Sequence, residues 1–430
     1  MKVAFYTLGC KVNQYETDLM IENFRKNNYE IVDFLEKADI YVINSCSVTT
    51  VATRKTRQML SRAKKKNGIV VLCGCYAQEI ENQKIDNVDI VVGNEEKNDV
   101  VKIVEEYISK NSKKNIVYKV ANISNIKKFS QTDLLEKGIN IRESLKIEDG
   151  CNNFCSYCII PYLRGRVRSK DISKIEEETK NLVKSGVKEI VVVGIEIASY
   201  GKDLEDDINL VDVIEKISKI DGLERIRLGS IEPRILTTEN IIRLSKIKKL
   251  CNHFHISVQS LNNDILKAMN RHYTVEDLFN ITDKLKEYFE NPALTCDIIV
   301  GFPGETEDMF NETLKNAEKI GFYEVHTFKY SKRKWTRAAN MENQVDGNEK
   351  NRRSGELINL AKSLKLKYMT CYLNTKQEVL IEEYKDGYLY GYTKNYIKVK
   401  IRGDKKLWGC LLMIELNSID EDLILGDICD

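Results

Sequence analysis

Short apolar runs alternate with amphipathic segments along most of this chain, and this alternation restricts the folds that it can adopt. Between residues 1 and 108 the apolar runs are about five residues long, and the segments between them have helical spacing. Buried runs of this length separated by helices are typical of a parallel, doubly wound sheet. The sequence therefore predicts an amino-terminal α/β domain with strands at Val3–Thr7, Ile40–Ile43, Ile69–Leu72 and Val88–Val92 and helices such as Tyr15–Lys26 and Thr53–Lys66.

The alternation returns after residue 144 and continues for six units. Residues 109–144 are polar and poorly periodic, and we interpret them as a connector with one strand at Ile116–Val120. Six strand–helix units predict a partial (β/α)6 barrel, with functional groups at the carboxyl ends of its strands. The predicted strands are Leu145–Glu148, Ile190–Val193, Arg225–Gly229, His253–Val258, Thr295–Val300 and Glu324–Phe328, with helices such as Ile172–Ser185, Leu210–Ile220, Val275–Phe289 and Glu307–Ile320.

The last part of the chain has a different pattern. Apolar residues in Glu349–Tyr372 form one helical stripe. Short alternating strands with glycine turns follow it and predict a small β-barrel. The predicted organisation is thus an amino-terminal domain at 1–108, a connector at 109–144, a barrel with its carboxy-terminal helix at 145–372 and a small β-barrel at 373–430.

Three cysteines, Cys151, Cys155 and Cys158, follow directly on the first predicted barrel strand, four and then three residues apart. Structural zinc sites and ordinary four-iron clusters take four protein ligands. A loop with three thiols holds a cubic cluster by three corners and leaves one iron open to bind a small molecule and transfer an electron. The alternatives are a zinc knuckle with its fourth ligand elsewhere and plain buried thiols, but the spacing directly after a strand favours iron–sulfur.

Three further cysteines, Cys10, Cys46 and Cys75, each follow one strand of the amino-terminal domain. The loops after parallel strands emerge at one edge of the sheet, so these thiols are expected to converge into a second site. Each one taken singly also fits a small buried residue. Cys73 competes with Cys75, because alternate residues of a strand share a face; we predict that Cys75 is the ligand.

Glycines and polar residues occur at the other strand ends of the predicted barrel. A small ligand with an amine, a carboxylate and a nucleoside needs close backbone approach, carboxylate partners and an apolar cover. The sequence therefore predicts a small-molecule pocket whose candidate residues are Gly194, Glu196, Ser230, Glu232, Gln259 and Gly301.

Composition and charge indicate the partners. The chain opens with a strand pattern and has no apolar run of the roughly 18 residues needed to cross a bilayer, so we expect a cytoplasmic protein without a membrane partner. In that compartment 12 cysteines indicate metal rather than disulfides. The net charge is only +2, yet basic residues cluster in patches. The patches predict RNA contacts at Arg54, Arg57, Arg164, Arg166, Arg168, Lys398 and Lys400.

The RNA prediction has an alternative at each patch, because a basic run also describes a solvated helix face. In the last module Tyr388, Tyr390, Tyr392 and Tyr396 alternate with lysines, a pattern that suits base stacking and equally an exposed strand. From Cys371 onward the sequence has eight basic and eleven acidic residues, so any RNA contact there would be limited to a local basic patch.

With these motifs assembled, the chain resembles the radical S-adenosylmethionine methylthiotransferases over nearly its whole length. The Cys-x-x-x-Cys-x-x-Cys loop is a mark of the superfamily, and its combination with the three upstream cysteines is far more specific. The segments Thr7–Glu16 and Gly74–Gln78 resemble the branch that acts on threonylcarbamoyladenosine beside the anticodon of tRNA. The chain departs from the family at Cys73, at Leu261, where Gly is usual after Gln-Ser, and at Trp335, where Gly is common.

The resemblance implies two [4Fe–4S] clusters and S-adenosylmethionine. Cys151, Cys155 and Cys158 are expected to hold the cluster that binds and cleaves S-adenosylmethionine, with Tyr157 against the adenine. The resulting deoxyadenosyl radical would remove hydrogen from carbon 2 of the modified adenine. A second cluster on Cys10, Cys46 and Cys75 would carry the sulfur that is methylated and transferred.

The resemblance also implies a carboxy-terminal TRAM domain, tRNA as partner, a flavodoxin- or ferredoxin-like electron donor and a sulfur donor. Two alternatives remain open. The enzyme could act instead on isopentenyladenosine in tRNA, whose branch tends towards a Gln-Met-Asn opening, or on a ribosomal protein. The chain could also be a non-catalytic iron–sulfur RNA-binding protein, a hypothesis that gives no reason for the polar rim of the barrel.

Overall fold

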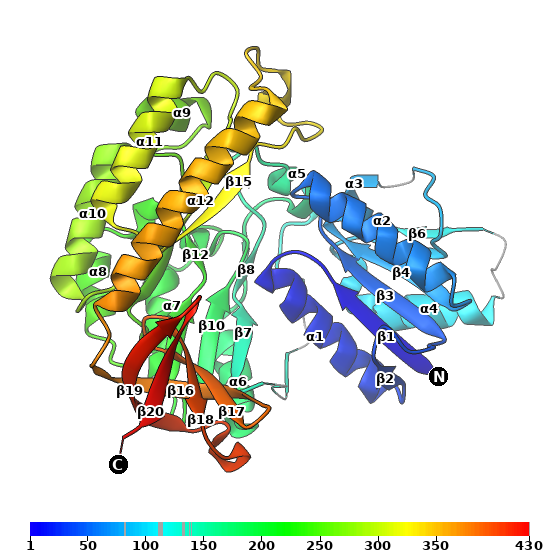
Figure 1. Ribbon diagram of the computed structural model, residues 1–430. Helices are drawn as coiled ribbons and strands as arrows, with labels where there is room; N and C mark the ends of the chain where they lie inside the picture. The colour runs from blue at the N-terminus through cyan, green and yellow to red at the C-terminus, as the bar shows by residue number, and fades with distance from the viewer. Residues whose placement is uncertain (81–82, 111–114, 131–133, 137, 139, 430) are drawn as a thin grey trace.

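The structure is a computed structural model that describes residues 1–80, 83–110, 115–130, 134–136, 138 and 140–429. Three units follow one another along the chain (Figure 1). An amino-terminal α/β domain lies beside a central partial barrel, and a small closed β-barrel at the carboxy terminus lies against the central barrel.

The amino-terminal domain is a six-stranded parallel sheet in the order β2-β1-β3-β4-β5-β6. Separate hydrophobic clusters cover its two faces, which confirms the predicted doubly wound sheet. Two strands of the sheet differ from the prediction. The short β2 was not predicted. Strand β6, which corresponds to the strand expected in the connector, pairs with β5 and therefore belongs to this sheet. The elements are β1 Lys2–Thr7, α1 Lys11–Lys26, β2 Glu30–Val32, β3 Ile40–Ser45, α2 Thr50–Lys64, β4 Ile69–Gly74, α3 Cys75–Ile80, β5 Ile90–Val92, α4 Val100–Ser109 and β6 Val117–Lys119.

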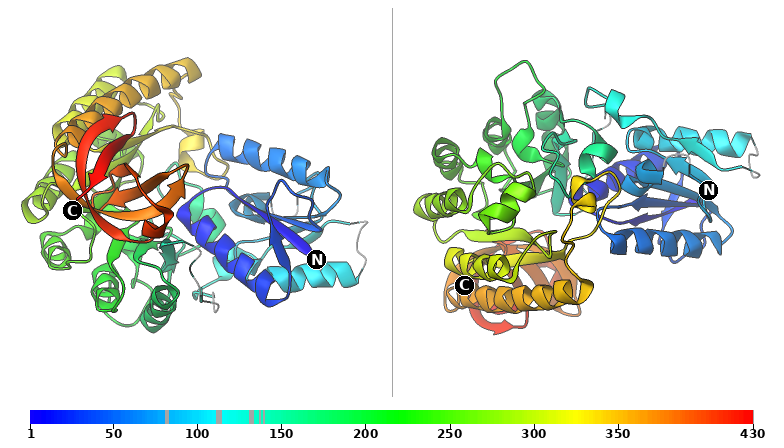
Figure 2. Two further views of the ribbon diagram at one scale, coloured as in Figure 1. Left: turned by 60° about the horizontal axis from the view of Figure 1, so that its bottom comes forward. Right: turned by 90° about the horizontal axis from the view of Figure 1, so that it is seen from above.

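The central unit is the predicted partial barrel of parallel strands. It consists of a three-stranded sheet, β11-β10-β7, and a four-stranded sheet, β12-β13-β14-β15, linked where β11 runs directly into β12. The helices form an outer layer over one continuous core (Figures 1 and 2). The strands are β7 Arg142–Lys146, β8 Glu148–Asp149, β9 Arg168–Ser169, β10 Glu189–Val193, β11 Arg225–Leu228, β12 Ser230–Ile231, β13 His253–Gln259, β14 Ala293–Val300 and β15 Glu324–Lys329. The helices are α5 Ile160–Arg164, α6 Ile172–Lys184, α7 Leu210–Ser218, α8 Thr238–Ser245, α9 Asn263–Ala268, α10 Val275–Tyr288, α11 Glu307–Ile320 and α12 Gly347–Thr370.

Helix α1 belongs to two cores at once. Met20 and Phe24 pack into the amino-terminal domain, whereas Tyr15 and Leu19 belong to the core of the central barrel. The Tyr15 hydroxyl donates to the buried Glu178 carboxylate at 2.7 Å. The two domains therefore share a buried contact rather than a flexible link.

The carboxy-terminal barrel closes in the order β16-β17-β18-β20-β19, which confirms the predicted small β-barrel. Two buried arginines of β11 fix it to the central barrel. Arg225 donates to the carbonyl oxygens of Tyr392 and Glu378, both at 2.8 Å, and the Arg227 guanidinium lies 4.5 Å from the centre of the Tyr396 ring. The strands are β16 Lys376–Lys385, β17 Tyr388–Thr393, β18 Lys398–Arg402, β19 Leu411–Asp420 and β20 Leu423–Ile428. Within the described residues no helix has the length and apolar character needed to cross a membrane.

Candidate functional site

A cavity of about 280 Å³ opens at the carboxyl ends of the barrel strands. Its wall comes from both domains. Val48 and Thr49, two and three residues after Cys46, come from the amino-terminal domain and line the cavity together with Cys151, Cys155 and Cys158 of the central barrel. The lining includes Cys151, Asn153, Cys155, Tyr157, Cys158, Ile195, Glu196, Ser257, Gln259, Arg271, Asp297, Ile299 and Phe328.

The loop of Cys151, Cys155 and Cys158 begins at a glycine that the backbone requires. A Cβ on Gly150 would lie 1.9 Å from the Arg166 carbonyl oxygen, and the φ angle of Gly150 is 86°. Two donors reach the sulfurs. The backbone N–H of Asn153 donates to Cys151 Sγ at 3.5 Å, and Arg271 Nη1 donates to Cys155 Sγ at 3.3 Å. Such N–H···S bonds tune iron–sulfur sites.

Cys10, Cys46 and Cys75 come together at one edge of the amino-terminal sheet. Cys10 is the residue before α1, Cys46 directly follows β3, and Cys75 begins α3 after β4. Gly9 lets two of these loops approach, since a Cβ there would lie 3.0 Å from the Cys46 Cβ atom. The Val48 N–H donates to Cys46 Sγ at 3.5 Å.

Cys73 lies elsewhere. Its side chain is fully buried in the hydrophobic cluster on one face of the sheet, and its thiol donates to the Ile43 carbonyl oxygen at 3.6 Å. Cys75, in contrast, packs with Ile159 and Leu163 beside the central barrel. The geometry therefore supports Cys75 as the third thiol of the site.

The number of thiols in each trio suits a cluster better than a structural zinc ion. Each trio offers three thiols, one fewer than the four protein ligands of a structural zinc site or an ordinary four-iron cluster. Three cysteines can hold a cubic cluster by three corners and leave one iron open to another molecule.

The residues predicted for the small-molecule pocket separate into two groups. Tyr157, Glu196 and Gln259 line the cavity, and Gln259 adopts a φ angle of 66° there. The other four lie at strand ends next to it. Gly194 packs so closely that a Cβ would lie 2.7 Å from Glu148 Oε2, and Gly301 has a φ angle of 70°. Ser230 is exposed on β12, and the Glu232 side chain caps the turn after it.

The residues predicted to contact RNA also separate. Arg54 and Arg57 are exposed on α2, Arg166 is exposed after the cysteine loop, and Lys398 and Lys400 are half-buried on β18 beside tyrosines. Arg164 and Arg168, in contrast, are only 1% and 3% exposed. The RNA interpretation is therefore wrong for Arg164 and Arg168, whose charges are used inside the protein.

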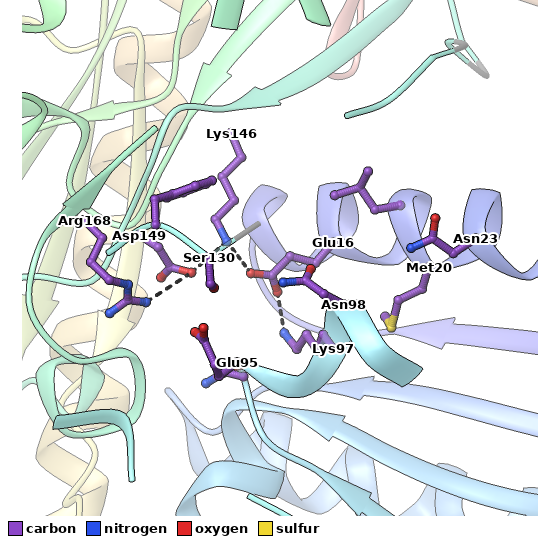
Figure 3. Close-up of a pocket in the computed structure, with 13 residues that line it drawn as sticks. Glu16, Met20, Asn23, Glu95, Lys97, Asn98, Ser130, Lys146, Asp149 and Arg168 are labelled. Carbon is purple, nitrogen blue, oxygen red and sulfur yellow. Dashed lines mark hydrogen bonds and ion pairs between the residues drawn. The ribbon is translucent and has the colours of Figure 1, made fainter. Parts of the chain in front are cut away.

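Arg164 is part of a buried ionic junction between the two domains, formed by Glu16, Lys97, Lys146, Asp149 and Arg164 together with Arg168. Arg164 Nη1 contacts Glu16 Oε1 at 2.7 Å and Asp149 Oδ2 at 3.0 Å. Lys146 Nζ contacts the same two carboxylates at 2.8 and 2.7 Å, and Lys97 pairs with Glu16 (Figure 3). Burial alone would raise the pKa of the Glu16 carboxyl, but Arg164, Lys146 and Lys97 together hold it well below its ordinary range.

Several site residues were not found from the sequence. Arg271 reaches Cys155 from a loop 116 residues away along the chain, and no local pattern marks it. Asn94, whose Nδ2 lies 4.0 Å from Cys75 Sγ, follows Gly93 at the end of β5, and that strand-end position was a usable signal. Asp297, which lines the cavity, contacts two histidines. Its Oδ2 lies 3.2 Å from His255 Nε2 and its Oδ1 lies 3.3 Å from His326 Nδ1, and the three residues come from the adjacent strands β14, β13 and β15.

Known proteins match the whole chain. Residues 145–317 match the Radical SAM superfamily, and residues 2–93 match the family described as Uncharacterized protein family UPF0004. The chain is 40% identical over 424 residues to "Threonylcarbamoyladenosine tRNA methylthiotransferase MtaB" of Bacillus subtilis, covering 96% of this chain and 93% of the relative. It is 37% identical over 411 residues to the protein of the same name from Aquifex aeolicus, covering 95% and 98%.

A relative with another substrate in its name is also similar. The "tRNA-2-methylthio-N(6)-dimethylallyladenosine synthase" of Clostridium botulinum is 34% identical over 438 residues, covering 98% of this chain and 95% of the relative. Among solved structures, the radical S-adenosylmethionine methyltransferase TsrM from Kitasatospora setae superposes with a TM-score of 0.58 at 13% identity, covering 79% and 75% of the two chains; this likeness concerns the fold. The superfamily uses S-adenosylmethionine and [4Fe–4S] clusters, and the two sets of three free thiols in this chain provide ligands for two such clusters. The chain belongs to the radical S-adenosylmethionine methylthiotransferase family.

Proposed function

We propose that this protein attaches a methylthio group to carbon 2 of N6-threonylcarbamoyladenosine beside the anticodon of tRNA. One observation carries the proposal: the cavity that contains Cys151, Cys155 and Cys158 is walled on its other side by the residues that follow Cys46. A substrate in this cavity would contact Cys151, Cys155 and Cys158 and lie next to the loop that carries Cys46. The relatives named for threonylcarbamoyladenosine reach 40% and 37% identity and those named for dimethylallyladenosine reach 36%, which favours the former nucleoside.

The geometry supports two ligand sets. Cys151, Cys155 and Cys158 would hold one [4Fe–4S] cluster, and Cys10, Cys46 and Cys75 the other. When bound, the clusters and S-adenosylmethionine supply one-electron chemistry and the sulfur. The protein supplies positioning: Arg271 and the Asn153 N–H hold two of the sulfurs, and the apolar side chains of Ile195, Ile299 and Phe328 reduce the access of water.

The remaining groups around the cavity would orient the small molecules. Glu196 accepts from Asn153 Nδ2 at 3.1 Å, which links the cysteine loop to the end of β10. Tyr157, Glu196 and Gln259 line the space next to the cysteines and are our candidates for binding S-adenosylmethionine, with Gly194, Ser230, Glu232 and Gly301 at the adjoining strand ends. We further propose that the carboxy-terminal barrel is a TRAM domain, that a flavodoxin- or ferredoxin-like protein and a sulfur donor serve the reaction, and that it takes place in the cytoplasm.

The substrate assignment is tested by nucleoside mass spectrometry of tRNA. A strain without this protein should contain threonylcarbamoyladenosine without its methylthio group, and the wild-type chain should restore the modification. Persistence of the methylthiolated nucleoside in the deletion strain would refute the assignment. Loss of methylthiolated isopentenyladenosine instead would move the protein to the other tRNA branch.

The division of labour between the thiol trios is tested in the reconstituted enzyme. Cys46→Ala should still cleave S-adenosylmethionine when given a strong reductant but should form no methylthio product. Cys155→Ala should do neither. Cys371→Ala, a change at an exposed cysteine outside both trios, serves as the matched control and should retain both activities.

A further inference from the structure

Three aromatic side chains stand in a row at the edge of the cavity, and we call them the aromatic rim: Phe154, Tyr162 and Trp335. The ring centres of Phe154 and Tyr162 are 5.8 Å apart, and those of Tyr162 and Trp335 are 6.3 Å apart. Tyr162 is 39% exposed and Trp335 is 42% exposed. Phe154 stands between Asn153 and Cys155, and Trp335 stands two residues after Arg333; Asn153, Cys155 and Arg333 all line the cavity. The rim thus continues the active-site opening onto the surface.

Both ends of the rim adopt a backbone conformation that bulky residues rarely take. The φ angle of Trp335 is 68° and that of Phe154 is 45°. Left-handed backbone at a large side chain costs free energy, and such strain is concentrated at functional positions. An exposed tryptophan contributes little to the core, so packing gives no reason for it to occupy a position where glycine would be unstrained.

The loop that carries Trp335 is tied to both cysteine trios. Arg333 Nε donates to the carbonyl oxygen of Val48, beside Cys46, at 3.0 Å. The Ala338 N–H donates to the carbonyl oxygen of Ser156, inside the other cysteine loop, at 2.8 Å. These two bonds hold Trp335 at a defined position relative to the reaction site.

Positive charge surrounds the rim. Arg166 lies 4.4 Å above the Phe154 ring, and Lys334 Nζ lies 4.7 Å from the Trp335 ring. Residues 331–338 contain four basic residues and no acid. Aromatic faces combined with lysine and arginine are the composition that binds single-stranded nucleic acid, since bases stack on the rings while phosphates meet the cations.

We propose that the aromatic rim is a stacking surface for the unpaired bases that flank the target adenosine. A base placed in the cavity must leave its stack, and its neighbours lose a stacking partner in the same step. Phe154, Tyr162 and Trp335 replace that partner at the point where the RNA strand enters. This inference rests on the proposed function for the identity of the RNA but not for the stacking itself.

Tryptophan fluorescence gives a direct test, because the chain has only two tryptophans, Trp335 and Trp408. In the reconstituted Trp408→Phe variant, Trp335 is the single tryptophan. Its emission should fall when an anticodon stem-loop RNA carrying N6-threonylcarbamoyladenosine is added. In Trp335→Phe, where Trp408 alone remains, emission should not change. Bound RNA that leaves the emission of Trp335 unchanged would overturn the proposal.

Affinity gives the second test. Trp335→Gly and Tyr162→Leu should each weaken binding of the same stem-loop by about 5- to 150-fold, the range for loss of one stacked base. Trp335→Gly should not lower the melting temperature, because glycine adopts the φ of 68° without strain. Phe279→Leu is the matched control, because it removes another aromatic ring that has a lysine above it. Phe279 is on α10, and Lys319 Nζ lies 3.9 Å from the centre of its ring. This change should not alter the affinity.

Stem-loops with abasic residues on both sides of the target adenosine complete the design. Wild type and Trp335→Gly should bind them equally, since no flanking base remains to stack; a persistent difference would contradict stacking. A stem-loop that quenches Trp335 but is not methylthiolated would reject the proposed substrate and keep the stacking surface. A stem-loop that does not bind at all would reject both.

Discussion

Charge balance in the ionic junction predicts which of its members matters most for holding the two domains together. The junction contains four cations, Lys97, Lys146, Arg164 and Arg168, and among the described residues two carboxylates pair with them, those of Glu16 and Asp149. We expect Glu16→Gln, which keeps the shape of the side chain and removes its charge, to be more damaging than Arg164→Met. Hydrogen-bond counting alone predicts the opposite order, because Arg164 makes five hydrogen bonds to Glu16, Asp149 and Asn13.

The magnitude follows from what each substitution leaves behind. Lys97 is 3% exposed, and within the described residues its ion pair is with Glu16. Glu16→Gln therefore leaves a buried ammonium without a counter-charge, at a cost of about 3–5 kcal/mol. After Arg164→Met, Glu16 keeps Lys97 and Lys146, and Asp149 keeps Lys146. That change removes hydrogen bonds but leaves no buried charge without a counter-charge, and it should lower the free energy of unfolding by about 1–3 kcal/mol.

Hydrogen–deuterium exchange of the anaerobic, cluster-loaded protein measures the effect locally, which matters because a chain of several domains need not unfold in one step. Amides of α1 should exchange roughly 100- to 3,000-fold faster in Glu16→Gln, as 1.4 kcal/mol corresponds to tenfold. Amides of β13 serve as an internal reference and should keep their rates. An equal or larger acceleration in Arg164→Met would refute the charge-balance reasoning.

Three further outcomes are expected. Cys75→Ala should lose about half of the iron, one of two clusters, and Cys73→Ala should keep it; iron analysis giving the reverse pattern would show that Cys73 is the ligand. Gly194→Ala should destabilise the protein by about 1–3 kcal/mol, since its Cβ would lie 2.7 Å from Glu148 Oε2; an unchanged melting temperature would show that Glu148 moves aside. Burial raises the pKa of Asp18 to about 7, so the protonated native form is favoured and stability falls as pH rises from about 4 to 7. Asp18→Asn should remove roughly 2 kcal/mol of this fall between pH 5 and 7, and equal pH profiles of melting temperature in the two proteins would contradict the shift.

Elements with one dominant local signal were predictable from the sequence. All six residues of β3 are buried, and its first four, Ile40–Ile43, form the uninterrupted apolar run that marks such a strand. The position of a cysteine just after a strand was also sufficient to place Cys10, Cys46 and Cys75 at one edge, because parallel strands share their direction.

Features that depend on tertiary contacts were not predictable. Arg164 and Arg166 are two residues apart in one basic run, yet one is buried among carboxylates and the other is exposed. The carboxylate of Glu16, 148 residues away along the chain, decides the difference. Similarly, Tyr392 and Tyr396 had the pattern of a base-stacking strand, but Arg142 lies over both rings, at 4.9 and 5.2 Å, inside the contact between the two barrels.

Arg225 and Arg227 fix the distance between the small barrel and the catalytic cavity. Both arginines are buried on β11. Arg225 donates to backbone carbonyl oxygens, which every residue type provides, so this attachment does not depend on the side chains of the small barrel. The strand that carries Lys398 and Lys400 consequently lies at a fixed distance from the cavity. An RNA bound through the proposed contacts with these lysines would present to the cavity only the nucleotide that lies at this distance along its fold. We therefore expect distance to select the position within the RNA, and RNAs that share one shape but differ in their bases to be equivalent substrates.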